Sequence, residues 1–217
     1  MMTGETVTEV YVPYLKEKIK IRPKSANIYT MKEVLSEESF DYGNEADTIV
    51  DVGAHIGLKT LYFSRMYYDA KIISIEPDKE NYNLLEKNTS NKNNVITINK
   101  PLWSRVESFK KIEGNGKNNH MFLPCKEGCY ISTTIEKIME KYELENIDIL
   151  KIDIEGAEKF IFSNSEINRW LSSTNLIEIE VHSNTEKKKV VNYIKKKGMK
   201  KEGNFSDKLV FKHKNVD

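Results

Sequence analysis

Three acidic residues lie close together near the middle of the chain, where an almost continuous apolar run ends. Residues 147–154 are apolar except Asp148, Lys151 and Asp153, and Glu155 and Glu158 follow them. Charged groups within a strand that is covered on both faces are costly unless they are paired, so this pattern indicates a functional edge. Acids that start a helix are the alternative interpretation, above all for Glu158.

A second run of alternating residues, 176–182, contains Glu178, Glu180 and His182. Alternation in a strand places these three side chains on one face and the apolar residues on the other. If the strand is internal, its acids need partners, and we predict Lys151 as their counter-ion. An edge strand with one solvated face is the alternative.

These two runs predict a catalytic group formed by Asp153, Glu155 and His182. The carboxyl ends of neighbouring parallel strands lie about 4.8 Å apart, so the three side chains can meet over one acceptor. His182 is the first candidate for a general base, because histidine has a reference pKa of about 6.5. Clustered carboxylates with a histidine could also bind Mg²⁺, but we assign no metal.

A glycine-containing turn comes earlier, where the apolar residues 48–52 run into a helical pattern. Asp51, Gly53, Ala54 and Gly57 form it, and its glycine spacing is Gly-x-x-x-Gly. A dinucleotide site would instead require Gly-x-Gly-x-x-Gly to hold a pyrophosphate. A carboxylate before the first glycine suits a ligand with an ammonium group, which favours S-adenosylmethionine over NAD. A tight strand-to-helix corner without a ligand is the alternative.

Glu76 and Pro77 end the next apolar run, 71–75. A carboxylate at this point can accept hydrogen bonds from both ribose hydroxyls of a nucleoside cofactor. Capping of the next helix is the alternative role for Glu76, but Asp78 already fills it. After the third apolar run we assign Leu102 to the cofactor site, and Trp103 either stacks near the adenine or belongs to the core.

The elements that position these residues alternate between short β-branched runs and longer helical patterns, which is typical of parallel strands joined by crossover helices. The sequence therefore predicts an α/β Rossmann-like fold with a seven-stranded, mostly parallel sheet. An antiparallel hairpin at 199–202 and 209–212 closes it, and a further hairpin is expected around 113–119. The expected strands are 48–52, 71–75, 95–98, 147–154 and 176–181, and the expected helices are 58–68, 78–88, 134–142, 157–162 and 186–197.

The composition is that of an ordinary globular domain, with 217 residues, 39% hydrophobic and 31% charged residues and a net charge of +1. We expect one domain, with residues 1–46 as an extension that caps the active-site edge and residues 47–217 as the core. Cys125 and Cys129 are expected to be free thiols. No run approaches the length of a membrane span and the first residues lack a signal-peptide core, so we expect a cytoplasmic protein.

The quoted motifs together resemble the ordered signature of FkbM-type methyltransferases. The resemblance covers residues 21–182, and the run 151–158, Lys-Ile-Asp-Ile-Glu-Gly-Ala-Glu, is its most specific element. It implies a class I methyltransferase that uses S-adenosylmethionine, commonly on hydroxyls of sugars or polyketide-type natural products. It also implies that Asp51, Gly53 and Gly57 line the methionine end. Asn27 and Ser104 depart from the family pattern, in which aspartates are frequent.

We therefore predict O-methylation of a hydroxyl on a sugar, glycan or small natural product, with a small-molecule or glycan acceptor as partner. RNA methylation is the runner-up, because residues 187–201 are rich in lysine; a solvated helix face is the alternative reading of those lysines. A non-catalytic nucleotide-binding module and a nicotinamide oxidoreductase are further alternatives. The oligomeric state and the identity of the acceptor stay open.

Overall fold

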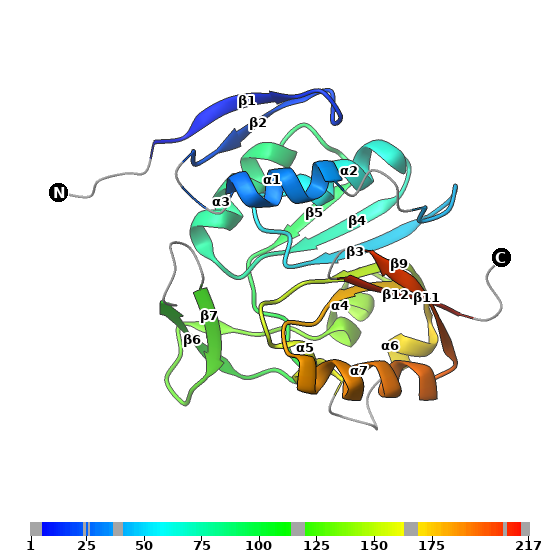
Figure 1. The fold of residues 1–217 in the computed structure, drawn as a ribbon. Coiled ribbons are helices and arrows are strands. Elements are labelled where there is room, and N and C mark those ends of the chain that lie inside the picture. The colour runs from blue at the N-terminus through cyan, green and yellow to red at the C-terminus, as the bar shows by residue number, and fades with distance from the viewer. Residues whose placement is uncertain are drawn as a thin grey trace.

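A twisted seven-stranded sheet forms the centre of the molecule (Figure 1). The computed structural model describes residues 6–23, 25, 27–36, 41–113, 120–162, 169–205 and 208–213. Five strands pair in parallel, and the last two form an antiparallel hairpin whose strand β12 is also antiparallel to β10, as the sequence predicted. The strand order is β11-β12-β10-β9-β3-β4-β5. The strands are β3 (Thr48–Val52), β4 (Lys71–Ile75), β5 (Val95–Ile98), β9 (Ile147–Ile152), β10 (Thr174–Glu180), β11 (Met199–Phe205) and β12 (Lys208–His213).

Helices cover both faces of the sheet and make the three-layer sandwich seen in Figure 1. On one face lie α1 (Asn27–Ser36), α2 (Leu58–Met66) and α3 (Lys79–Thr89), and on the other α4 (Ile135–Lys141), α5 (Glu158–Ile161), α6 (Arg169–Ser172) and α7 (Asn184–Lys196). Each layer has its own apolar core. In the described part of the chain, none of the helices is long and apolar enough to cross a bilayer.

The helix starts follow the local sequence. The Asp78 side chain accepts hydrogen bonds from the backbone N–H groups of Glu80 and Asn81, so the capping role predicted for Asp78 is confirmed. The Thr134 side chain caps α4 in the same way. The predicted strand 147–154 stops earlier, at Ile152, because the chain turns there and Glu155 takes a positive φ of 54°.

The amino-terminal part of the chain packs on the α1–α3 side. The strands β1 (Thr8–Val12) and β2 (Glu17–Ile21) form a hairpin over α3 (Figure 1). Asn88 on α3 fixes it, because its side chain bonds both backbone groups of Lys20 and the carbonyl of Ile56. The chain then leads into α1, whose Thr30 reaches the carboxyl edge of the sheet.

A separate three-stranded antiparallel sheet stands beside that edge. It contains β6 (Ser108–Glu113), β7 (His120–Pro124) and β8 (Tyr130–Ile131). Strands β6 and β7 pair as a hairpin, in the region where the sequence predicted one. The tip of that hairpin, 114–119, lies outside the described residues.

Candidate active site

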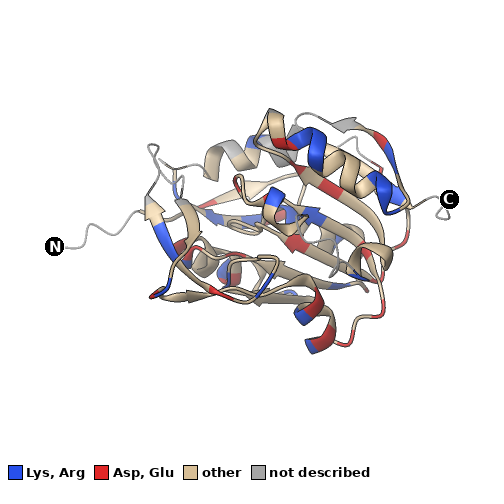
Figure 2. Ribbon diagram, turned by 90° about the horizontal axis from the view of Figure 1, so that it is seen from below, with Lys and Arg blue, Asp and Glu red and all other residues tan. Residues whose placement is uncertain are grey.

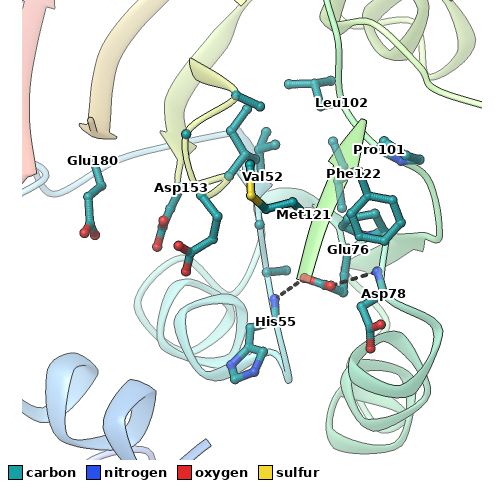
Figure 3. Close-up of a pocket in the computed structure, with 18 of the residues that line it drawn as sticks. Val52, His55, Glu76, Asp78, Pro101, Leu102, Met121, Phe122, Asp153 and Glu180 are labelled. Atoms are coloured by element: carbon teal, nitrogen blue, oxygen red, sulfur yellow. Dashed lines mark hydrogen bonds between the residues drawn. The ribbon is translucent and has the colours of Figure 1, made fainter. Parts of the chain in front are cut away.

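A cavity of about 430 Å³ opens at the carboxyl ends of the parallel strands (Figure 3). Its size is within the usual range for small-molecule sites. The turn after β3, the end of β4, the loop after β5, strand β7 and the segments after β9 and β10 all contribute to its wall. Among the predicted site residues, those that line it are Gly53, Ala54, Glu76, Pro77, Leu102, Asp153, Glu155 and His182.

At Gly53 the backbone of the glycine turn lies in close contact with the backbone of Asp153. Its φ is +76°, and a Cβ placed on it would lie 1.7 Å from the carbonyl oxygen of Asp153. Only glycine fits here, because both the backbone conformation and the space exclude a side chain. Gly57 does not line the cavity; its φ is +90°, and a Cβ there would lie 2.8 Å from Leu85 Cδ1 on α3. Gly57 therefore serves the packing of α2 against α3.

The structure gives Asp51 a role different from the predicted ligand contact. Its side chain is fully buried and does not line the cavity. The hydroxyl of Thr60 donates to it at 2.6 Å, and the Lys151 ammonium lies 3.6 Å away. Lys151 in turn donates to the carbonyls of Val52 and Gly53, at 3.3 and 2.9 Å. Asp51 thus acts through Lys151, which holds the backbone of the glycine turn.

Glu76 lies at the floor of the cavity, between the glycine turn and α3 (Figure 3). One carboxylate oxygen accepts from the backbone N–H of His55 at 2.8 Å, and the other from that of Asp78 at 2.9 Å. Burial raises the pKa of Glu76 to about 7, although these two hydrogen bonds act to lower it. Pro77 and Leu102 line the cavity beside it.

The predicted catalytic residues do come together at the other end of the cavity. The Nδ1 atom of His182 lies 3.1 Å from Glu158 Oε1. Its Nε2 atom lies 3.4 Å from Glu180, 3.5 Å from Glu155 and 3.9 Å from Asp153, in each case to a carboxylate oxygen. One imidazole is therefore surrounded by four carboxylates.

This surrounding changes the role of His182. The hydrogen bond to Glu158, followed by the nearby charges of Glu158, Glu155 and Asp153, raises the pKa of His182 to about 9, against an opposing effect of burial. The ring is then a cation near neutral pH and has no lone pair with which to accept a proton. The prediction of His182 as first candidate for the base did not allow for so many carboxylates.

The predicted partner of the strand β10 acids was wrong. Strand β10 is internal, between β9 and β12, so its buried Glu178 does require counter-ions. These are Lys59 at 3.7 Å and Lys208 at 3.8 Å, together with the hydroxyl of Tyr42, which donates a hydrogen bond. Lys151 pairs with the aspartates on either side instead. Lys59 and Lys208 come from a helix and from the last strand, whose positions over Glu178 depend on the fold.

Comparison with known proteins agrees with this geometry. The model of the methyltransferase FkbM domain matches residues 51–201. This chain belongs to the FkbM methyltransferase family. A curated relative, the methyltransferase sdnD of Sordaria araneosa, is 26% identical over 189 residues, which cover 69% of this chain and 73% of that protein.

Solved structures show the same fold at low identity. TrmK of M. capricolum, in complex with S-adenosyl-homocysteine, has a TM-score of 0.50 and 10% identity and covers 87% of this chain and 71% of its own. A putative tRNA (m1A22) methyltransferase of Streptococcus pneumoniae, Sp1610, has a TM-score of 0.50 and 11% identity, with 86% and 70% covered. The chain is thus an S-adenosylmethionine-dependent methyltransferase with a class I, Rossmann-like fold.

The cavity of this FkbM-family protein fits that cofactor. Its wall carries the carboxylates of Glu76, Asp153, Glu155 and Glu180, which can pair with the sulfonium and ammonium groups of such a ligand. Another part of the wall is apolar: Trp103 packs against Phe109 and Phe160, with ring centroids 5.0 and 4.5 Å apart, and Met121 and Phe122 of β7 also line the cavity (Figure 3). S-adenosylmethionine supplies an activated methyl group, so the protein has only to orient the acceptor and remove its proton.

Asp153, Glu155 and His182 also present one ligand atom each within 4.8 Å of one another, close enough to hold a single metal ion. Mg²⁺ prefers oxygen ligands such as carboxylates, and imidazole suits transition metals better. The imidazolium of His182 also pairs directly with the carboxylates of Asp153 and Glu155, so the cluster can be explained by ion pairs alone.

His55 lies within the glycine turn but was not among the predicted site residues. The imidazole lines the cavity, and its two nitrogens lie 3.1 Å from Asn27 Nδ2 and 3.0 Å from Thr30 Oγ1. Burial, and then the positive charges of Arg22 and Lys151, lower the pKa of His55 to about 4, so its ring is neutral. Its partners come from a segment 25 or more residues earlier, which no local motif indicates.

Proposed function

We propose that this enzyme methylates a hydroxyl group on a sugar, glycan or small natural product. The supporting observation is the wall at the acceptor end of the cavity, where Asp153, Glu155 and Glu180 surround the imidazolium of His182. Carboxylates accept hydrogen bonds from neutral hydroxyls, and the four carboxylates around a single imidazolium disfavour a polyanion at this point of the wall. A neutral, polyhydroxylated acceptor suits such a wall.

In this proposal Asp153 removes the proton from the acceptor oxygen. Its side chain lines the cavity and is 23% exposed, and its backbone carbonyl is in close contact with Gly53. A hydroxyl oxygen becomes strongly acidic as it gains a methyl group, so a carboxylate suffices as the base. Lys151, 3.6 Å from Asp153, holds the carboxylate toward the glycine turn.

His182 has an electrostatic role in the same scheme. As a cation it offsets the mutual repulsion of the four carboxylates around it and keeps them at one point of the wall. The Glu158 carboxylate, which is buried, accepts from Nδ1 and fixes the orientation of the ring. Glu155, with 57% of its side chain exposed, can contact a bound acceptor while it pairs with His182.

RNA methylation is the competing function, and the lysines of α7 are the feature that favours it. Acidic residues are interspersed with basic ones over the helices (Figure 2), and Lys189 pairs with Glu186 at 3.3 Å. A surface of mixed sign binds a phosphate backbone less well than a continuous basic stripe does. The likeness to the putative tRNA methyltransferase Sp1610, at 11% identity, concerns the fold alone.

The test is a labelling experiment. Protein is incubated with S-adenosylmethionine carrying a carbon-13 methyl group and, in separate reactions, with a small-molecule extract, a glycan fraction and total RNA. Label in an O-methyl group of the first or second fraction supports the proposal, and label in RNA alone contradicts it. Asp153→Asn should abolish the labelling, whereas Asp69→Asn, an exposed aspartate in the turn before β4, is the matched control and should retain it.

A further inference from the structure

Five residues from three separate parts of the chain form a closed ring of hydrogen bonds beneath the cofactor end of the cavity. Arg22 donates from its backbone N–H and from Nε to Asn27 Oδ1, at 2.8 and 3.3 Å. Asn27 Nδ2 lies 3.1 Å from His55 Nε2, and the backbone N–H of His55 donates to Glu76 at 2.8 Å. Asn81 donates to the other oxygen of Glu76 at 3.5 Å and accepts from Arg22.

The direction of each bond in this ring is fixed by chemistry. Asn27 Oδ1 is occupied by Arg22, so its Nδ2 is the donor toward His55, and His55 Nε2 must be an acceptor. The neutral ring then carries its proton on Nδ1, which donates to Thr30 Oγ1 at 3.0 Å. The amide of Asn27 accepts on one side and donates on the other, which a carboxylate at this position could not do.

Four members of the ring are buried, which limits the access of water to their bonds, and His55 is half-buried at the cavity wall. Asn27 is completely buried, and Arg22 and Glu76 are 5% and 6% exposed. His55 is held at a positive φ of 52°, a conformation that a residue other than glycine seldom adopts without local support. The side-chain bonds of His55 to Asn27 and Thr30 supply that support, and the backbone N–H of His55 is thereby directed at Glu76 (Figure 3).

We propose that Asn27 and His55 are positioning residues for the cofactor, and that Arg22, Asn27 and Thr30 are working parts of the cofactor site through their hold on His55 and Glu76. Glu76 is the group we assign to the ribose hydroxyls, so this inference rests on that assignment. It is independent of the identity of the acceptor. Without the ring, the N–H of His55 is no longer directed at the carboxylate, and Glu76 loses one of its fixed orientations.

The groups around Glu76 control its ionisation, so loss of the His55 hydrogen bond should be visible in the pH dependence of cofactor affinity. Arg22 donates to Asn81 and pairs with Glu80 at 3.3 Å. Lys111 of β6 pairs with Asp78 at 2.5 Å. The hydrogen bonds from His55 and Asp78 favour the ionised form of Glu76, which is the form that accepts from two hydroxyls. Weakening the hydrogen bond from His55 should therefore raise the pKa of Glu76, and with it the midpoint pH of the cofactor-affinity profile.

The experiment is a calorimetric titration of the full-length protein with S-adenosyl-homocysteine from pH 5.5 to 8.5. Asn27→Ala should lower the affinity at pH 7.5 by about five- to thirtyfold, the range expected for lost buried hydrogen bonds, and should shift the midpoint of the affinity profile upward. His55→Asn, which tolerates a positive φ but is too short to contact Asn27 and Thr30, should give the same two changes.

Asn88→Ala is the matched control. It removes another buried asparagine that ties the amino-terminal hairpin to the same turn, through Lys20 and Ile56, but it touches no member of the ring. It should lower the melting temperature without changing the affinity profile. Equal losses of affinity in Asn27→Ala and Asn88→Ala would overturn the proposal, because general loosening would explain both.

Glu76→Gln separates the two remaining outcomes. If it weakens binding while Asn27→Ala and His55→Asn bind normally, the ring is structural only and the proposal is wrong. If Glu76→Gln itself binds normally, the ribose assignment fails and the ring has nothing to position, which also overturns the proposal. Neither result affects the O-methylation proposal, which the labelling experiment tests separately.

Discussion

The protonation state of His182 distinguishes two mechanisms that the sequence alone could not separate. In the folded protein its pKa is raised from 6.5 to about 9, chiefly by the hydrogen bond to Glu158. At pH 7 only about 1% of the rings are then neutral, because each pH unit below the pKa reduces the neutral fraction tenfold. An NMR titration of the imidazole, which needs no acceptor, should give a midpoint near 9. In Glu158→Gln the midpoint should fall toward the reference value.

Turnover should follow the charged form if His182 acts as a cation. The rate at saturating acceptor should then be maintained up to pH 9 and fall beyond it, as the four carboxylates lose their counter-charge. If neutral His182 were the base, the rate at pH 7 would be about 1% of its maximum and would rise about tenfold per unit up to pH 9. Initial rates of S-adenosyl-homocysteine formation between pH 6 and 10 separate the two slopes.

His182→Gln provides the control for this profile. It keeps a polar side chain near Glu158 but does not titrate, so the fall at alkaline pH should disappear and the remaining rate should be lower at every pH. A wild-type midpoint near 6.5, with activity that rises through it, would refute the reasoning and restore His182 as the base.

Three further predictions concern stability. Glu178→Gln leaves two buried lysines without their carboxylate, which should cost about 3–5 kcal/mol and lower the melting temperature by about 6–20 °C, checked by calorimetry; an unchanged value would contradict the pairing. Gly53→Ala should prevent stable folding because its Cβ meets backbone at 1.7 Å, whereas Gly156→Ala, with no atom within 4 Å, should cost only about 1 kcal/mol through its positive φ. The pKa of His55 is lowered to about 4, so the unfolded chain binds this proton more tightly and stability should rise with pH between 4 and 6.5. In urea denaturation, the free energy of unfolding of His55→Asn should lack up to about 3 kcal/mol of that rise. If the free energies of the two proteins changed in parallel with pH, the prediction would be wrong.

The parts of the fold that sequence could predict are those fixed by local pattern. Strands β3, β4 and β5 occupy the predicted residues 48–52, 71–75 and 95–98, because β-branched runs bounded by turn residues leave little choice of register. The convergence of Asp153, Glu155 and His182 was also predictable, since it needs only that neighbouring parallel strands end at one edge.

What could not be predicted depends on contacts between distant segments. The counter-ions of Glu178 come from α2 and β12, and nothing in the local sequence places either of them. The partners of His55 lie on α1, so its neutral state and its place in the cavity wall follow from tertiary packing alone. The pKa of His182 likewise depends on Glu158. An acid at the start of a helix is usually exposed to solvent, whereas Glu158 is buried beside the imidazole.

The role of Asp51 shows where the register of the sheet adds information. Asp51, Lys151 and Glu178 are paired across three adjacent strands, and therefore lie on one level of the sheet. The residues two positions further along each strand are Gly53, Asp153 and Glu180, and all three line the cavity. Side chains two residues apart share a face, so each site residue has a buried charge directly beneath it.

The lower level consists of groups that bond the protein, and the upper level of groups that face the ligand. Asp51 and Glu178 are at most 3% exposed and neither lines the cavity, whereas Asp153 and Glu180 are 23% and 22% exposed at the side chain. Lys151 connects the two levels, since it pairs with Asp51 below and with Asp153 above. A buried charge is tolerated when it is paired, and here the pairing also fixes the base proposed for catalysis. The buried structural acids and the acids proposed for catalysis are therefore separated by only two residues along each strand. Sequence alone does not distinguish the two sets, because the distinction depends on where the strand ends.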